Sequence, residues 1–294
     1  LQFYKKKGSN LLSDGYMPIS HKFKKWQKVS AKFKYKNGLI CKGKGKIRIT
    51  GDFSDHYHPQ LPLTSFALKL SDFAIYNNTR FKVLLPKTRN GANEVFLTTF
   101  LSHLGFLSPE TRLVRVRFGK ITSLIMIFQE DINKEFIEKN KYVEGPIVEA
   151  NENIKIGFFD NEKYLNKYPL FDVRFALPKI KNSKWSFRSN ENYKDSLVAM
   201  NSLNNVFFEN IERHIKSGNT KSRYNIQGNF NLLNRQNNSK FKVLDCVEKA
   251  LQLSHASILS NRIFYYDIYQ DSIEPIIYDF NFSGNSFNEE KRKR

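Results

Sequence analysis

Residues 255–279 read HASILSNRIFYYDIYQDSIEPIIYD, and this stretch decides how the rest of the chain is interpreted. Two runs rich in β-branched and aromatic residues, 263–269 and 273–278, are separated by a short polar turn. The pattern predicts two antiparallel strands that form a hairpin. The hairpin would hold Asn261 at one end and bring Asp279 back beside it.

Asn261 and Asp279 carry the kind of oxygen atoms that bind Mg²⁺, because an amide oxygen and a carboxylate are both hard ligands. A site that transfers phosphoryl groups needs such ligands for the metal ions that neutralise the phosphates of ATP. The alternative is an ordinary hairpin flanked by polar surface residues, since Asn and Asp are common in turns. Taken alone, the stretch favours the ordinary hairpin.

Composition limits the classes of protein to consider. A chain of 294 residues can form one large domain or two lobes, and its 40% hydrophobic and 14% aromatic residues exclude a disordered chain. Its 48 Lys and Arg against 28 Asp and Glu give a net charge of +20, which favours polyanionic partners. These could be nucleic acid, an acidic membrane surface, nucleotide phosphates or an acidic protein, and the charge does not choose among them.

Cysteine content and hydropathy exclude other classes. Cys41 and Cys246 are far apart in the sequence, which predicts neither a zinc site nor a disulfide framework. No hydrophobic run approaches the length of a membrane span.

The first half of the chain alternates strand and helix signals. A basic segment at 1–21 is followed by a hairpin that turns at Asn37 and Gly38, and by a short strand at 65–70 that carries Lys69. A helix is expected at 93–104, with Glu94 in its first turn. Glu94 could be a solvated charge favoured by the helix dipole, or it could pair with Lys69 and hold its ammonium against nucleotide phosphates.

Two more strands are expected at 111–118 and 121–128, and a hinge between two lobes is expected at Glu130. This order of strands, lysine strand, helix with an early Glu and two further strands is that of a protein-kinase small lobe. The second half is dominated by helical patterns at 132–138, 193–217 and 241–253.

Several motifs in order resemble the bacterial CotH-type atypical kinases. RITGDFSDH at 48–56 and SFALK at 65–69 resemble the opening of that family. The match continues to Asp279 through the following segments: Thr88-Arg89-Asn90, Asn93-Glu94, FQED at 128–131, EGPI at 144–147, His255, NRIFYY at 261–266 and EPIIYD at 274–279. Each motif alone is weakly specific, and their order carries the resemblance.

The resemblance implies an α+β, two-lobed protein-kinase-like fold. Its antiparallel-sheet small lobe would span 22–130, and its mainly helical large lobe with the metal-binding hairpin would span 131–287, followed by a charged tail at 288–294. It also implies that the chain binds ATP with Mg²⁺ or Mn²⁺ and transfers the γ-phosphoryl group to Ser or Thr of a protein. In the ATP site that it implies, Lys69 holds phosphates, Glu94 orients Lys69 and Glu130 contributes at the hinge.

For the catalytic end, the resemblance implies that Asp279 binds the metal with Asn261 as a second ligand. The family places an Asp slightly upstream of the Asn as the base, whereas this chain has His255 in that region. His255 could act as the base or could only orient its loop, and the second role is favoured for a lone histidine. Loss of the Asp need not abolish transfer, because the loose transition state of phosphoryl transfer depends mainly on positioning and charge neutralisation.

Other functions are compatible with the same residues. One is a nucleotide-binding pseudokinase that acts as a scaffold of the cell envelope, and another is a basic polyanion-binding protein. Nucleic acid is not favoured, because no known binding motif is legible and the lysines are spread over many segments. An anionic membrane surface could bind the basic N-terminal segment. The expected partner is an acidic or envelope-associated protein, and the expected location is extracytoplasmic or membrane-associated in a bacterium.

Overall fold

The computed structural model describes residues 19, 23–51, 54–57, 64–118, 123–150, 177–216, 238–251, 253 and 262–280. The chain divides into two compact units. Unit 1 comprises Leu1–Thr99 and Pro109–Ile132, and unit 2 comprises Phe100–Ser108 and Asn133–Arg294. The predicted small lobe at 22–130 included residues 100–108, whereas the structure groups these residues with unit 2.

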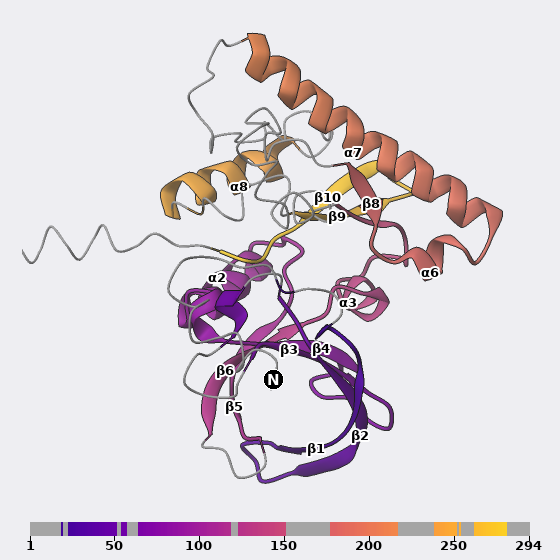
Figure 1. Cartoon of the computed structure of the whole chain (residues 1–294). Coiled ribbons are helices and arrows are strands. Elements are labelled where there is room, and N and C mark those ends of the chain that lie inside the picture. The colour runs from indigo at the N-terminus through magenta and orange to yellow at the C-terminus, as the bar shows by residue number, and fades with distance from the viewer. Residues whose placement is uncertain are drawn as a thin grey trace, which may run out of the picture. The chain divides into compact units, whose positions relative to one another are not determined.

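Unit 1 is built on a six-stranded antiparallel sheet with the strand order β1-β2-β3-β4-β6-β5. The sheet curls strongly, so that its inner face encloses a core (Figure 1). The strands are β1 (Gln27–Lys34), β2 (Ile40–Ile49), β3 (Phe66–Leu70), β4 (Arg80–Leu84), β5 (Thr111–Val116) and β6 (Leu124–Glu130).

The predicted hairpin at Asn37 and Gly38 is present between β1 and β2. Gly38 has a φ of +87°, which a residue without a Cβ adopts at no steric cost, and Leu39 N–H donates to Asn37 Oδ1 at 3.2 Å. Alternate residues of β1, including Val29 and Phe33, pack against the core, whose buried members are Phe66, Leu68, Leu70, Ile75, Phe81, Val83, Leu85, Met126 and Phe128.

Strand β4 was not predicted from the sequence, and it separates β3 from β6 in the sheet. It leads through the short 3-10 helix η3 (Pro86–Thr88) into the helix α2 (Ala92–His103), which matches the predicted helix within one residue at each end. The link between η3 and α2 uses left-handed backbone at Asn90 and Gly91, with φ values of +54° and +63°. The strand directly before the Glu94 helix is therefore β4 and not β3.

Unit 2 contains a four-stranded antiparallel sheet with the order β10-β9-β7-β8. Ala199 and Leu203 of α7 join Val148, Phe264 and Ile273 of the sheet in one hydrophobic core. The elements of this unit are α3 (Lys134–Lys139), β7 (Ile147–Ala150), β8 (Pro178–Ile180), α6 (Ser183–Ser186), α7 (Asn190–Lys216), α8 (Asn238–Leu251), β9 (Ile263–Asp267) and β10 (Ser272–Ile276).

The hairpin predicted within 255–279 is present, because β9 and β10 pair antiparallel. Both strands are shorter than predicted, and a turn at residues 268–271 joins them. Pro275 is accommodated because β10 is an edge strand, where a missing N–H removes no ladder hydrogen bond on the open side. Among the described helices, none is both long enough and apolar enough to cross a membrane.

An ion-pair cluster joins β7 to β8 and makes stability depend on pH. The Glu149 carboxylate lies 3.1 Å from Lys181 Nζ and 3.2 Å from Lys179 Nζ. Burial alone would raise the pKa of Glu149, but the two ammonium groups outweigh it and lower that pKa below its ordinary value of 4.5. The ionised carboxylate therefore stabilises the fold above that ordinary value, and its contribution is lost as the pH falls through the lowered pKa.

We predict that Glu149→Gln lowers the free energy of unfolding by about 1.5–3 kcal/mol at neutral pH, because charge-assisted hydrogen bonds are lost. Urea titrations of both proteins at neutral pH and well below the ordinary carboxyl pKa test this. The difference should shrink in acid. A difference that stays constant with pH would show that the Glu149 charge does not stabilise the fold.

Candidate site residues

One row of residues crosses the sheet of unit 1 from strand to strand. Arg48 lies opposite Ala67, Ala67 opposite Lys82, Lys82 opposite Gln129, and Gln129 opposite Thr111. Directly opposed residues of antiparallel strands point to the same face of a sheet. Because the neighbouring residues Phe81 and Phe128 point into the core, this row lies on the outer face.

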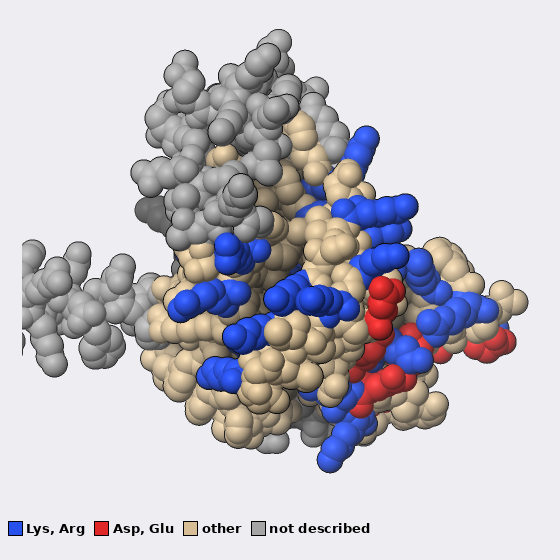
Figure 2. All heavy atoms as spheres, turned by 90° about the horizontal axis from the view of Figure 1, so that it is seen from below, with Lys and Arg blue, Asp and Glu red and all other residues tan. Residues whose placement is uncertain are grey.

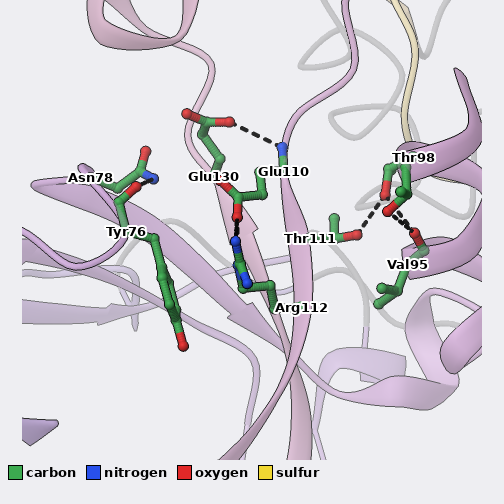
Figure 3. A network of polar contacts seen from close by, with 9 residues as sticks. Tyr76, Asn78, Val95, Thr98, Glu110, Thr111, Arg112 and Glu130 are labelled. Atoms are coloured by element: carbon green, nitrogen blue, oxygen red, sulfur yellow. Dashed lines mark hydrogen bonds and ion pairs between the residues drawn. The ribbon is translucent and has the colours of Figure 1, made fainter. Parts of the chain in front are cut away.

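Helix α2 packs on the same outer face. The hydroxyl of Thr98 on α2 lies 2.5 Å from the hydroxyl of Thr111, the last residue of the row (Figure 3). The Thr98 hydroxyl also donates to the carbonyl oxygen of Glu94 at 2.9 Å. Glu94 lies one helical turn before Thr98, on the same side of the helix, and is completely buried. The structure thus places Glu94 and Lys82 on the same face of the sheet.

A buried carboxylate is costly unless a cation or hydrogen-bond donors satisfy it. Lys82 is half-buried on the face that Glu94 occupies, and both side chains take part in interactions within the structure. Beside Lys82 in the row, Gln129 is buried, with 2% of the residue exposed, and its Nε2 has no hydrogen-bond partner among the described residues. An ammonium and an amide N–H on one face are suited to bind an anionic oxygen.

The expected ion pair between Lys69 and Glu94 is not formed. Lys69 is exposed and lies between Lys46 and Arg80 of the neighbouring strands, and no ion pair of Lys69 occurs in the described part of the chain. Glu94 is completely buried beside the outer face of the sheet, whereas the Lys69 ammonium faces solvent. Lys82 was missed, although the alternation of RFKVL at 80–84 just before the helix was a legible signal.

The side chain of Glu130 accepts a hydrogen bond from the backbone of the neighbouring chain segment. Its Oε2 accepts a hydrogen bond from Glu110 N–H at 3.0 Å, and the Glu110 carboxylate pairs with Arg112 (Figure 3). The Arg112 guanidinium in turn lies 4.4 Å from the ring centroid of Tyr76. Glu130 is opposite Phe81 and so points to the inner face, away from the face of Lys82. Its side chain therefore joins β5 to β6.

The opening motifs of the resemblance meet at one end of this sheet. Ser65 links them, since its N–H donates to His56 O at 2.8 Å and its hydroxyl accepts from Leu85 N–H at 2.9 Å. Gly51 is required here, because its φ is +96° and an added Cβ would lie 2.1 Å from the His56 ring. Burial raises the pKa of Asp55 above its ordinary value, although the His56 backbone, Arg89 and Lys87 oppose this.

In unit 2, Asp279 follows the hairpin with an unusual backbone. It is 9% exposed, and its φ of +64° is left-handed, which costs on the order of 1–3 kcal/mol for a residue other than Gly. The preceding strand end is fixed by Ile277 N–H, which donates to Leu107 O at 2.8 Å.

His255 and Asn261 lie outside the described residues, so the structure places neither of them. Within the described ranges, no group of three or more His, Cys, Asp or Glu side chains could hold a metal ion. Asp279 alone still fits a metal bound together with a nucleotide, because Mg²⁺ takes most of its ligands from phosphates and water and needs one or two carboxylates.

Comparison with models of known protein families and with curated proteins found no match to either. No family is assigned. The kinase interpretation therefore depends on the motifs and on the geometry within each unit.

Proposed function

We propose that this chain is an ATP-dependent protein kinase in which Lys82, and not Lys69, binds the nucleotide phosphates. The supporting observation is the position of Lys82 on the strand that leads into α2, on the same face as the completely buried Glu94. Protein kinases hold ATP with a strand lysine that a helix glutamate orients. The substrate proposed is Ser or Thr of a protein at a bacterial envelope.

Each residue has a distinct task in this proposal. Glu94 draws the Lys82 ammonium toward α2 and fixes its direction, so that little reorganisation is needed when phosphates bind. Gln129, on the adjacent strand, donates its side-chain amide N–H to a phosphate oxygen of the nucleotide. Asp279 would supply a carboxylate ligand for Mg²⁺ or Mn²⁺, with Asn261 as a second ligand, and the metal would supply positive charge that neutralises the phosphates.

His255 is proposed to orient its loop and not to act as the base. The reaction tolerates the loss of an acidic base, because its transition state is loose and depends mainly on positioning and on neutralisation of phosphate charge. Slow transfer of the γ-phosphoryl group is therefore expected.

The proposed function is tested by incubating the full chain with γ-labelled ATP and Mg²⁺ or Mn²⁺ and following labelled Ser or Thr. Metal-dependent label on the chain itself or on a basic or acidic carrier protein is expected. Nucleotide binding without any transfer would instead favour a pseudokinase scaffold, and absence of both would exclude the proposal.

Asp279→Asn should remove the metal-dependent part of any thermal stabilisation by ATP while the fold is retained. Asn is the appropriate replacement, because it tolerates the left-handed backbone at this position and removes only the charge. Thermal unfolding with ATP and Mg²⁺, and with ATP and a chelator, measures the effect. If the difference in unfolding temperature between ATP with Mg²⁺ and ATP with a chelator is unchanged in the variant, a residue other than Asp279 is the metal ligand.

A further inference from the structure

The outer face of unit 1 carries a lysine face over β1, β2 and β3, which we define by the residues Lys28, Lys32, Lys34, Lys42, Lys44, Lys46 and Lys69. All of these side chains are exposed. The pairing of the strands sets them directly opposite one another: Lys32 faces Lys42, Lys28 faces Lys46, and Lys46 faces Lys69. In the part of the chain that the structure describes, none of them forms an ion pair.

Like charges directly opposite each other destabilise a sheet, so the lysine face has a cost that the fold itself does not require. Lysines on an edge strand protect it from pairing with other chains, which accounts for those of β1. That explanation does not extend to β2 and β3, because both are interior strands with a neighbour on each side. In Figure 2, Lys and Arg side chains are spread over the visible face of the molecule, whereas Asp and Glu gather toward one side.

An apolar tip adjoins the lysine face. Leu39 and Ile40 are 56% and 45% exposed where the β1–β2 hairpin turns, between Lys36 and Lys42. Two adjacent exposed aliphatic side chains at a turn gain free energy when the turn enters an apolar phase. The phosphates of a polynucleotide cannot bury them in this way.

The composition of the face also discriminates between polyanions. Single-stranded nucleic acids are held by aromatic side chains on which bases stack, and the outward positions of the three strands carry no aromatic residue. Trp26, directly before β1, is covered by the Arg48 guanidinium, which lies 4.9 Å from its ring centroid. Lysine is a hydrated point charge without the planar fork by which arginine recognises phosphates and bases of nucleic acids. A two-dimensional array of lysines beside an apolar tip matches an anionic lipid surface instead.

We propose that the lysine face and the Leu39–Ile40 tip form the surface by which this chain docks on an anionic membrane. The lysines attract the lipid headgroups, and the tip enters the boundary between headgroups and acyl chains. This inference rests on the surface of unit 1 alone and does not depend on the kinase proposal. It differs from the sequence-based expectation, which assigned membrane contact to the basic N-terminal segment.

Cosedimentation of the full chain with vesicles tests the proposal. Vesicles of equal parts phosphatidylcholine and phosphatidylglycerol should bind the chain, and vesicles of phosphatidylcholine alone should not. The variant Lys42→Gln/Lys44→Gln/Lys46→Gln should bind on the order of 100-fold more weakly. The matched control Lys184→Gln/Lys194→Gln/Lys242→Gln removes the same charge from exposed positions of unit 2 and should bind within about threefold of the unchanged protein.

Equal weakening by both triple variants would overturn the docking surface, because binding would then follow net charge only. The proposal also fails if DNA at the same salt concentration binds more tightly than the vesicles and the β2 variant removes that binding. If the β2 variant does not fold, the Leu39→Trp variant provides an independent measurement. Its tryptophan fluorescence should be quenched by brominated lipid in the anionic vesicles beyond the background of Trp26 and Trp185, and absence of this additional quenching would contradict insertion of the tip.

Discussion

Replacing Lys82 by Met should lower the rate of phosphoryl transfer about 100-fold or more, because the developing charge on the phosphates loses a preorganised cation. Met keeps the length and the apolar stem of the side chain, so the change is largely confined to the ammonium. Lys69→Met is the matched control, since both lysines point to the outer face of neighbouring strands. It should leave the rate within about twofold, as expected for a lysine that faces solvent.

The contrast between the two lysines separates two assignments of the phosphate-binding residue. Both variants should be compared at saturating ATP and metal, with thermal unfolding as a check that each is folded. A large loss of rate in Lys69→Met with normal transfer in Lys82→Met would show that Lys69 of β3, and not Lys82, binds the phosphates. Glu94→Gln should also lower the rate, because Lys82 would then lack its orienting carboxylate.

Replacing Arg262 by Met should destabilise unit 2 by about 3–5 kcal/mol, because the change leaves a buried carboxylate without its cation. Arg262, just before β9, pairs with Glu248 of α8, and their side chains are only 2% and 9% exposed. Burial lowers the pKa of Arg262 and the Glu248 charge opposes that effect. Urea unfolding of the full chain, monitored by circular dichroism, measures the loss.

A double variant provides the control for this pair. Arg262→Met/Glu248→Leu removes both charges and fills the space with apolar groups, and such replacements are often neutral. It should recover most of the stability that the single variant loses. A single variant that unfolds within about 1 kcal/mol of the unchanged protein would show that Glu248 is satisfied by other groups.

Local elements of this fold were predictable from the sequence because their signals are local. The Asn37-Gly38 turn, the α2 helix and the β9–β10 hairpin are each encoded by neighbouring residues. Strand β4 alternates as legibly as the other five-residue strands, but it was missed because it runs almost directly into the Pro86 turn, which hides it between the preceding loop and α2. Without β4, the lysine of the preceding strand was the natural but incorrect partner for Glu94.

The arrangement of the candidate site depends on long-range pairing that a sequence pattern does not contain. Alternation shows that Lys82 and Phe81 point to opposite faces, but only the strand order places Lys82 beside Gln129. The same holds for the lysine face, where the alternating lysines of β2 are visible in the sequence and their alignment with Lys28 and Lys69 is not.

Calorimetric titration of the full chain with ATP in the presence of Mg²⁺ is the decisive measurement of whether Lys82 binds the nucleotide. We predict saturable binding that a chelator weakens and that Lys82→Met reduces strongly, while Lys69→Met does not. Phosphates held by a cation and a metal together should also favour ATP over AMP. Absence of saturable ATP binding with either Mg²⁺ or Mn²⁺, in a protein shown to be folded, would show that this chain is not an ATP-dependent kinase.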